Sequence, residues 1–538
     1  MLLKKEKSLN QTMQNIMNKK GKQVEQCDAV LVRGVNWIGD AVMTIPALRS
    51  LKRSVPGSKI SLLVKPWVAP LFEKDPVVDE IILYTDEFKG VSGKLKLARK
   101  LKARGFCMAM LFQNAFDAAL LAFLAKIPKR IGYNRDGRRL LLTHPVAFDT
   151  HTRSLHHIDY YLNLTRRAGF ETMYEMPWIF LGPEERLKAR DMLALLKRPI
   201  VAINPGAAYG SSKRWHPERF AEVAEGVMQE LGGSVVLLGG PKEIGIADEI
   251  LRSMDSSLIT PDSLLNLAGR TSLRELAALI SECAVLVTND SGPMHIGYAV
   301  GTPLVAIFGS TSPELTGPVG SSDRVIIHKI ECSPCFEREC RKKDLQCMEL
   351  ITSQEVFDAV KKLMRTKRAV FFDRDGTLCK DAHYLSRMED FEIFPSIAGL
   401  KRLREEGFSL IGISNQSGIA RGLVQEEFAK KINHIFTDQH GFDDFYYCPH
   451  HPDDHCSCRK PEPGMLIKAR HEHGIDLKRS VVVGDKDDDM VLAKVVGAKG
   501  VLVRTGKAQS SQYADAVADG LDDAVRIILS MDEKGNSA

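Results

Sequence analysis

Two aspartates that directly follow an apolar strand are the most informative feature of this chain. Asp373 and Asp375 come after Ala369–Phe372, and Gly376 follows them. Strand side chains alternate with a period of two, so we expect both carboxylates on one side of the backbone. There they could share a divalent cation while Asp373 attacks a phosphorus atom. A buried carboxylate pair is unfavourable unless a metal or a shared proton compensates it. An acidic turn that caps a helix would explain Asp375 alone, so the pair favours phosphoryl-transfer chemistry.

Polar residues further along the chain supply the partners that this chemistry requires. Phosphoryl transfer through an aspartyl-phosphate needs a nucleophilic carboxylate, an acid/base, donors that hold the phosphate and a carboxylate that holds a metal. Several candidates end apolar runs or follow turns. They are Ser414, Asn415, Gln416, Ser417, Arg459, Lys460, Asp485 and Lys486.

The segment between Cys448 and Cys458 has the composition of a metal site. A Cys-x-His pair and a Cys-x-Cys pair offer three thiolates and an imidazole, the ligand set of a closed structural zinc site. The thiols and the candidate imidazoles are Cys448, Cys456, Cys458, His450, His451 and His455. A zinc ion here would brace the loop that carries Arg459 and Lys460 into the site.

A second cysteine cluster, at Cys332, Cys335, Cys340 and Cys347, has a spacing that permits a tetrahedral zinc site. Partly buried free thiols are an equal alternative, and the residues leave this choice open. Residues 1–26 are polar and Lys-rich without the apolar core of a signal peptide, so we expect a cytoplasmic chain. In that compartment clustered cysteines favour metal binding over a disulfide framework.

Glycine-containing polar loops follow several apolar runs in the first two thirds of the chain. They are Gly34–Asp40, Asn204–Ala208, Leu238–Pro241 and Thr288–His295, and Lys213 lies shortly after the second of them. A helix that begins after such a loop can hold a phosphate through free backbone N–H groups and the helix dipole. Several such loops with a lysine predict a diphosphate site. From the residues alone, Asp40 is either a helix cap or a proton acceptor.

Strand-like runs alternate with helical patterns in three successive series. The expected strands are Ala29–Arg33, Ile60–Val64, Glu80–Tyr84 and Met108–Phe112, then Ile200–Ile203, Ser234–Leu238, Ala284–Thr288 and Leu304–Phe308, and finally Arg368–Phe372, Ser409–Ile413, Val481–Val483 and Val501–Val503. Three βα series predict three doubly wound α/β units. The predicted division is a polar extension at 1–26 followed by domains at 27–184, 185–365 and 366–538.

The net charge of +6 over 538 residues conceals a local excess of basic residues. Between Val91 and Gly169 fifteen Lys or Arg stand against four Asp and no Glu, which predicts an anionic partner. Nucleic acid is not expected, because stacking aromatics are not interleaved with the basic residues and no reader motif is present. No apolar stretch approaches the ~20 residues of a membrane span.

The loops of the first two series resemble those of the ADP-heptose:lipopolysaccharide heptosyltransferases of glycosyltransferase family 9, the heptosyltransferase II branch in particular. The motifs that carry the resemblance are Asn36–Leu48 (NWIGDAVMTIPAL), Asn204–Arg214 (NPGAAYGSSKR) and Thr288–His295 (TNDSGPMH). The resemblance covers roughly Ala29 to Val360 and implies a GT-B fold, inversion at the anomeric carbon and no metal. It implies that Asp40 is the general base and that Lys213 neutralises the leaving diphosphate. The implied donor-binding loop is Asp290, Ser291 and Gly292.

The last third resembles the haloacid dehalogenase superfamily, which implies that Asp373 is the nucleophile and Asp375 the acid/base. The implied Mg²⁺ set is Asp373, Asp375 through its main-chain carbonyl, and Asp485, with the adjacent Lys486 included. The segment Cys448–Cys458 and the segment Asn415–Gly422 (NQSGIARG) resemble the D-glycero-D-manno-heptose 1,7-bisphosphate phosphatases, whose zinc loop is usually longer than this one. Alignment with that family favours His450 as the zinc ligand. Substrate recognition is then assigned to Asp381, Tyr384, Arg459 and Lys460.

Together the two resemblances imply a bifunctional enzyme of lipopolysaccharide core heptose metabolism. It would transfer heptose from ADP-heptose to the inner core and hydrolyse the C7 phosphate of heptose 1,7-bisphosphate. Mg²⁺ and Zn²⁺ would serve the phosphatase, and the acceptor would be met at the inner membrane surface. Two alternatives stay open at this point. One is a phosphatase for histidinol phosphate, and the other is a non-catalytic glycolipid-binding GT-B half.

Overall fold

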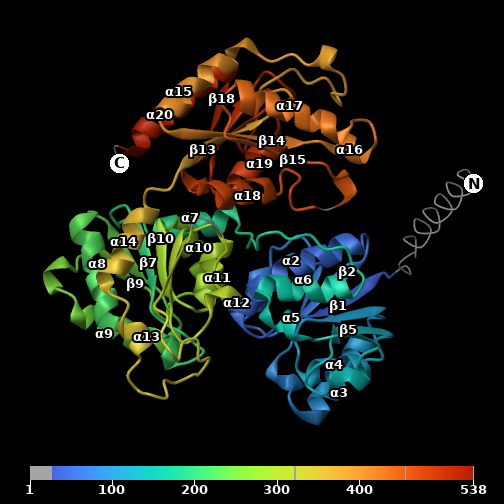
Figure 1. The fold of residues 1–538 in the computed structure, drawn as a ribbon, viewed down its shortest axis with the longest axis vertical. Helices are drawn as coiled ribbons and strands as arrows, with labels where there is room; N and C mark the ends of the chain where they lie inside the picture. The colour runs from blue at the N-terminus through green and yellow to red at the C-terminus, as the bar shows by residue number, and fades with distance from the viewer. Residues whose placement is uncertain (1–26, 320–322, 455, 537–538) are drawn as a thin grey trace, which may run out of the picture.

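The computed structural model describes residues 27–319, 323–454 and 456–536. Figure 1 shows three α/β units, coloured blue to cyan, green to yellow and orange to red along the chain. Each unit contains a six-stranded sheet in which every pair of neighbouring strands is parallel. The predicted polar extension at 1–26 lies outside the described residues.

The three sheets share one topology. The first contains β1 (Ala29–Arg33), β2 (Lys59–Val64), β3 (Glu80–Leu83), β4 (Met108–Leu111), β5 (Lys129–Tyr133) and β6 (His144–Val146) in the order β3-β2-β1-β4-β5-β6. The second contains β7 (Ile200–Asn204), β8 (Ser234–Leu237), β9 (Leu264–Asn266), β10 (Val285–Asn289), β11 (Leu304–Phe308) and β12 (Arg324–Ile327) in the order β12-β11-β10-β7-β8-β9. The third contains β13 (Arg368–Asp373), β14 (Phe408–Asn415), β15 (Asp444–Cys448), β16 (Val481–Gly484), β17 (Lys499–Val503) and β18 (Ala516–Ala518) in the order β15-β14-β13-β16-β17-β18. In each sheet the first strand therefore lies beside the fourth, where the strand order reverses.

Helices separate most of the successive strands along the chain and provide the crossover connections that parallel pairing requires. The first unit has α2 (Ile38–Ser54), α3 (Gly90–Lys102), α4 (Phe116–Leu124), α5 (Thr150–Ser154) and α6 (His157–Arg167). The second has α7 (Pro183–Met192), α8 (Pro217–Glu230), α9 (Ile244–Ser253), α10 (Leu273–Glu282), α11 (Gly292–Ala299), α12 (Pro313–Thr316), α13 (Gln346–Glu349) and α14 (Ser353–Leu363). The third has α15 (Lys401–Glu405), α16 (Ser417–Ala420), α17 (Glu426–Gln439), α18 (Gly464–His473), α19 (Asp487–Val496) and α20 (Leu521–Asn536). Among the described helices, none has both the length and the apolar content that crossing a membrane would need.

The predicted class of three doubly wound α/β units is confirmed, while the domain boundaries stay a prediction. All twelve expected strands correspond to strands of the sheets, because runs buried on both faces are continuously apolar. The sequence missed β5, β6, β9, β12, β15 and β18, which lie at or next to sheet edges. Their residues are partly exposed, so they lack a continuous apolar run; all three residues of β9, for example, are only half-buried.

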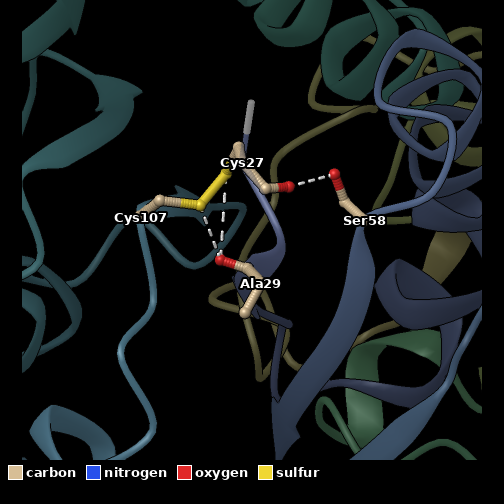
Figure 2. Close-up of a disulfide and its surroundings, with 4 residues drawn as sticks. All are labelled: Cys27, Ala29, Ser58 and Cys107. Carbon is tan, nitrogen blue, oxygen red and sulfur yellow. Dashed lines mark hydrogen bonds between the residues drawn. A yellow bond between two sulfur atoms is a disulfide. The ribbon is translucent and has the colours of Figure 1, made fainter. Parts of the chain in front are cut away.

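A disulfide in the first unit joins two cysteines that lie outside both cysteine clusters. Cys27 is bonded to Cys107, with their Cα atoms 5.7 Å apart, and Figure 2 shows the bond beside Ala29 and Ser58. Cys27 precedes β1 and Cys107 precedes β4, two neighbouring parallel strands that begin at the same edge of the sheet. Cys27 and Cys107 belong to neither cysteine cluster, and the sequence predicted no pairing for them. A separation of 80 residues concealed their proximity.

The third unit packs against the other two (Figure 1). Trp178 lies in the segment between α6 and α7 and is 1% exposed. It is buried in one apolar cluster with residues of the third unit, among them Phe371, Met465 and Leu477. The connection between the first two units is thus part of the core of the third.

Candidate active sites at the carboxyl ends of the sheets

The predicted site residues gather where each sheet reverses its strand order. In the third unit Asp373 ends β13 and Asp485 follows β16. In the second unit Asp290 follows β10, and the loop after β7 leads to Lys213. In the first unit the loop after β1 leads to Asp40. Open α/β sheets bind ligands at the carboxyl ends of the strands at this reversal point, so the topology itself selects these residues.

Asp40 lies in the first turn of α2 and faces His157 of α6. Trp37 is the N-cap residue, and no described side chain caps this helix end, so capping does not account for Asp40. Instead, His157 Nδ1 lies 3.1 Å from Asp40 Oδ1 and donates a hydrogen bond to the carboxylate. The Asp40 side chain is 26% exposed. A carboxylate that is oriented by one N–H donor and still open to solvent can accept a proton from a hydroxyl group. No local pattern pointed to His157, because it is 117 residues away from Asp40 in the sequence.

His295 of α11 links the first two units at this site. Its imidazole packs against Gly39, where an added Cβ would lie 2.6 Å from His295 Cδ2. Burial lowers the pKa of His295 to about 4, although the nearby carboxylates of Asp290 and Asp40 oppose the shift. The ring is therefore neutral at pH 7. Asp40 belongs to the first unit and Asp290 to the second, and both carboxylates lie near His295. The two units therefore meet at this residue.

Lys213 and Asp290 form the second-unit side of the site. Lys213 Nζ donates to Asp290 Oδ2 at 2.5 Å, and Thr311 Oγ1 donates to the same oxygen at 2.6 Å. Ser291 is the N-cap residue of α11 and Gly292 is its first residue. These predicted donor-site residues are thus brought together, with Thr311 as a partner that the sequence did not reveal.

A charged cluster is buried at the carboxyl end of the third sheet. Lys460 Nζ lies 2.6 Å from Asp373 Oδ1 and 2.6 Å from Asp489 Oδ1. Ligand oxygens of Asp373, Asp485 and Asp489 all lie within 4.8 Å of one another. Asp373 Oδ2 and Asp489 Oδ2 are buried and have no hydrogen-bond partner in the described part of the chain. Buried carboxylate oxygens without donors fit a divalent cation, which is the partner that oxygen ligands of this kind require.

The electrostatics of the cluster follow from burial and from the two lysines. Burial raises the pKa of Asp489 to about 7 and also raises the pKa of Asp485. Burial acts the same way on Asp373, but Lys460 and Lys486 outweigh it and lower its pKa. Lys486 Nζ lies 3.3 Å from Asp485 Oδ1 and 3.8 Å from Asp373 Oδ2. An ammonium group has no lone pair to offer a metal, so Lys486, which had been placed in the metal set, lies there as a counter-charge.

Asp489 is the third carboxylate of the buried cluster, and the sequence did not predict it. It lies in the first turn of α19, and its carboxyl group approaches Gly484, where an added Cβ would lie 2.3 Å from the carboxyl carbon. Asp487 and Asp488 on the same helix are exposed. A run of aspartates does not reveal which member faces inward. The spacing of four residues between Asp485 and Asp489 is the sequence feature that could have indicated Asp489.

Asp375 lies apart from these carboxylates, contrary to the expectation that it shares a cation with Asp373 through its side chain. Arg374 Nη2 donates to Asp375 Oδ2 at 3.0 Å, and Gln416 Nε2 donates to the same oxygen at 2.8 Å. The reason is local: β13 ends at Asp373, and Gly376 has a φ of 92°, so the period-two rule no longer applies. The buried Arg374, which the sequence did not predict as a site residue, orients Asp375 together with Gln416.

The remaining predicted residues surround this centre. Gln416 Nε2 also donates to Ser414 Oγ at 2.7 Å. Asn415 holds the main chain of Lys460 by two hydrogen bonds of 3.0 and 3.1 Å. Lys507 Nζ lies 3.3 Å from Asp381 Oδ2. Tyr384 is partly exposed, and Ser417 is buried at the start of α16. Arg459 Nη1 is buried and has no hydrogen-bond partner among the described residues.

The predicted zinc ligands converge next to this site. His450 Nδ1 lies 3.5 Å from Cys448 Sγ and 3.2 Å from Cys458 Sγ, and Cys448 Sγ lies 3.4 Å from Cys456 Sγ. All four ligand atoms lie within 4.8 Å of one another. His451 instead accepts a hydrogen bond from the main chain of Asp453. His455, the other candidate, lies outside the described residues. The loop leads directly to Arg459 and Lys460.

Comparisons with known proteins agree with this division of the chain. The profile of glycosyltransferase family 9 (heptosyltransferase) matches residues 94–346, and that of a HAD-hydrolase-like family matches residues 457–524. The chain is 32% identical over 307 residues to lipopolysaccharide heptosyltransferase 2 of Salmonella typhimurium, covering 55% of this chain and 87% of that protein. It is 40% identical over 178 residues to D-glycero-beta-D-manno-heptose-1,7-bisphosphate 7-phosphatase of Yersinia pestis, covering 30% of this chain and 94% of that protein. The solved structure of E. coli ADP-heptose lps heptosyltransferase II is similar, with a TM-score of 0.55 and 29% identity over 62% of this chain and 98% of that one.

Proposed function

The chain belongs to the heptosyltransferases of glycosyltransferase family 9 over its first two units and to the D-glycero-beta-D-manno-heptose-1,7-bisphosphate 7-phosphatases over its third, and we propose that it catalyses both reactions. One site transfers heptose from ADP-heptose to the lipopolysaccharide core. The other hydrolyses the C7 phosphate of heptose 1,7-bisphosphate. The observation that supports this most directly is that each relative is matched over nearly its whole length. In each matched region, acidic residues lie where the strand order of the sheet reverses.

In the transferase, Asp40 is assigned as the general base. As the acceptor hydroxyl oxygen bonds to heptose C1, Asp40 takes its proton, and the bond from C1 to the ADP oxygen breaks. The hydrogen bond from His157 Nδ1 orients the carboxylate for this step. Lys213, held beside Asp290, balances the negative charge that develops on the leaving diphosphate. Ser291 and Gly292 offer the N-terminus of α11 to the donor. We assign no metal to this half.

In the phosphatase, Asp373 is assigned as the nucleophile. Its carboxylate oxygen attacks the phosphorus atom, Asp375 gives a proton to the leaving C7 oxygen, and an aspartyl-phosphate forms. Asp375 then takes a proton from the water that hydrolyses this intermediate, which restores Asp373 and releases phosphate. Arg374 and Gln416 hold Asp375 in place for both proton transfers. Ser414 and Lys460 contact the transferring phosphoryl group. Asp381, Tyr384 and Arg459 bind the sugar.

We propose that Mg²⁺ binds at Asp373, Asp485 and the main-chain carbonyl of Asp375, with Asp489 as a further carboxylate at that site. The unpartnered oxygens of the buried carboxylates support this assignment. Bound Mg²⁺ supplies positive charge that neutralises the phosphate during attack.

We further propose that Zn²⁺ is held by Cys448, His450, Cys456 and Cys458. Three sulfurs and one imidazole nitrogen leave no open coordination position, so the role is structural. The ion would fix the loop that places Lys460 between the carboxylates.

Two alternatives are less well supported. Histidinol phosphate as the substrate is disfavoured by the identity of 40% to a heptose bisphosphate phosphatase. A non-catalytic, glycolipid-binding transferase half is disfavoured by the pairs Asp40–His157 and Lys213–Asp290, which are present and oriented. We propose that the transferase works at the cytoplasmic surface of the inner membrane, where the basic residues between Val91 and Gly169 would face anionic acceptors.

The experiment is a set of assays on the purified full-length protein. Phosphate release is measured with heptose 1,7-bisphosphate and with histidinol phosphate, and heptosyl transfer is measured with ADP-heptose and a heptose-acceptor lipopolysaccharide core. The proposal predicts preference for the heptose bisphosphate and measurable transfer. Preference for histidinol phosphate, or failure of transfer by folded protein, would overturn the corresponding half.

A further inference from the structure

The segment between β12 and α14 holds four cysteines that neither proposed active site uses. We call residues 331–350 the cysteine loop. It contains one short helix, α13, and no strand within this fully described stretch. Its cysteines, Cys332, Cys335, Cys340 and Cys347, are free thiols. An irregular segment of this length loses considerable conformational entropy on ordering, so strong interactions must hold it in one conformation.

The four thiols line one cavity. Cys347 is buried at this cavity, while Cys340 is partly buried and Cys332 and Cys335 are exposed. In the loop at Cys448 the ligand atoms already lie within 4.8 Å of one another. In the cysteine loop the thiols surround the cavity instead, and they would have to close over an ion.

The backbone of the cysteine loop is held in unfavourable conformations. Phe336, Lys343 and Leu345 have φ angles of 57°, 60° and 44°. The left-handed region costs a residue other than glycine roughly 1–2 kcal/mol, and such residues persist only where their surroundings fix them. Phe336 directly follows Cys335 and is 47% exposed, so its main-chain hydrogen bonds, and not burial of its ring, hold this conformation.

The cysteine loop also supports the loop that carries Lys213. The main-chain oxygen of Arg338 accepts a hydrogen bond from Ser212 N at 3.1 Å, and that of Phe336 accepts one from Tyr209 Oη at 2.7 Å. Gly210 packs so closely that an added Cβ would lie 2.1 Å from the Arg338 oxygen. The two loops are therefore in direct contact, and a shift of one moves the other.

The cysteine loop also contacts the residues next to Thr311. Phe336 N donates to the main-chain oxygen of Ser310 at 2.7 Å, and Ser333 Oγ donates to that of Gly309 at 2.5 Å. Thr311 in turn donates to Asp290. Both partners in the pair Lys213–Asp290 thus depend on the conformation of the cysteine loop.

We propose that Cys332, Cys335, Cys340 and Cys347 bind one Zn²⁺ as four thiolates and that this ion positions the donor-binding pair Lys213–Asp290. Binding releases the four thiol protons to solvent and involves no redox change. Four sulfur ligands complete a tetrahedron, so the site is structural and leaves no position for substrate. The zinc site stands on the cysteine loop alone, whereas the positioning role rests on the proposed transferase function.

The first test counts zinc in full-length protein by elemental mass spectrometry after dialysis against metal-free buffer. The wild type should hold one zinc more than the Cys335→Ser/Cys340→Ser variant. The matched control is Cys283→Ser, a free thiol outside both clusters, which should keep the wild-type count. A Cys448→Ser/Cys456→Ser variant that contains no zinc, or that contains iron instead, would overturn the proposed site.

A second readout does not depend on folding of the zinc-free variant or on activity. The Cys448→Ser/Cys456→Ser variant reconstituted with Co²⁺ should show the intense visible absorption of a tetrahedral cobalt–thiolate site. Absence of that absorption would contradict the proposal.

The positioning role is tested by donor kinetics. The Cys335→Ser/Cys340→Ser variant should have a KM for ADP-heptose raised by about tenfold, because small displacements of positioning groups are costly. Its phosphatase rate should be that of the wild type. An unchanged KM in a variant that has lost the zinc would overturn the positioning role. Failure of the wild type to transfer heptose would overturn the proposed function and the positioning role together, while the zinc count would still decide the site.

Discussion

The ammonium group of Lys478 in the third unit donates a hydrogen bond to the main-chain oxygen of Cys283 in the second unit at 2.6 Å. Lys478 is partly buried, and burial lowers its pKa. In the opposite direction, Arg186 of the second unit donates to the main-chain oxygen of Val495 in the third at 3.1 Å. Side-chain donors from both sides bond to main-chain oxygens of the other unit, so the phosphatase and transferase units are joined by more than their connecting chain.

The interface should depend on Arg470, which is buried on α18 with its Nη2 3.9 Å from Asp323 Oδ1. Arg470→Met leaves a buried carboxyl group without its counter-charge, and removing one partner of such a pair costs about 3 kcal/mol. We expect a lower thermal unfolding midpoint by calorimetry. Lys468→Met, an exposed change on the same helix, is the control. Equal midpoints for the two variants would show that the ion pair does not stabilise the interface.

Asp40→Ala should reduce kcat for heptosyl transfer by about a hundredfold or more, because an acceptor hydroxyl is too weak an acid to attack without a base. The KM for ADP-heptose should change little, since donor binding is assigned to the other side of the site. Steady-state kinetics with Asp28→Ala, an exposed aspartate before β1, provide the comparison. Wild-type kcat in Asp40→Ala would mean that the base lies elsewhere.

Lys213→Ala should weaken ADP-heptose binding as well as turnover, because its charge faces the diphosphate in both the ground state and the transition state. Calorimetric titration with ADP should show the loss directly. Lys197 precedes β7 and so lies at the opposite end of that strand from the site, which makes Lys197→Ala a suitable control. If the two variants bind ADP equally well, Lys213 does not contact the diphosphate.

Removal of divalent cations should stop phosphate release and leave heptosyl transfer unaffected. Asp489→Asn should raise the Mg²⁺ concentration needed for half-maximal phosphatase rate by about tenfold or more, since loss of a supporting carboxylate typically weakens a metal site to this degree. Its neighbour Asp488 is exposed, so Asp488→Asn should behave as the wild type. An identical Mg²⁺ dependence for the two variants would exclude Asp489 from the site.

The sequence predicted the parts of the fold that local pattern determines. Interior strands such as β7 and β10 are buried at every position and read as continuous apolar runs, whereas the short edge strands β9 and β18 do not. The site residues at strand ends, such as Asp373 and Asp485, were predicted for the same reason, because the ends of buried strands are easily recognised.

Contacts between distant segments were not predictable. His157 beside Asp40, the disulfide between Cys27 and Cys107, and the hydrogen bond from Lys478 to Cys283 each join residues at least 80 positions apart. The orientation of Asp489 depends on the rotation of α19 against its sheet, which a run of aspartates does not encode. Tertiary packing, and not local propensity, decides these features.

The most direct test of one chain with two independent active sites is the variant Asp373→Asn in the full-length protein. An amide cannot form the aspartyl-phosphate, so phosphate release from heptose 1,7-bisphosphate should be abolished. Heptosyl transfer from ADP-heptose, measured on the same preparation, should remain close to that of the wild type and show that the protein is folded. Retained phosphate release, or loss of both activities in a folded variant, would contradict the account.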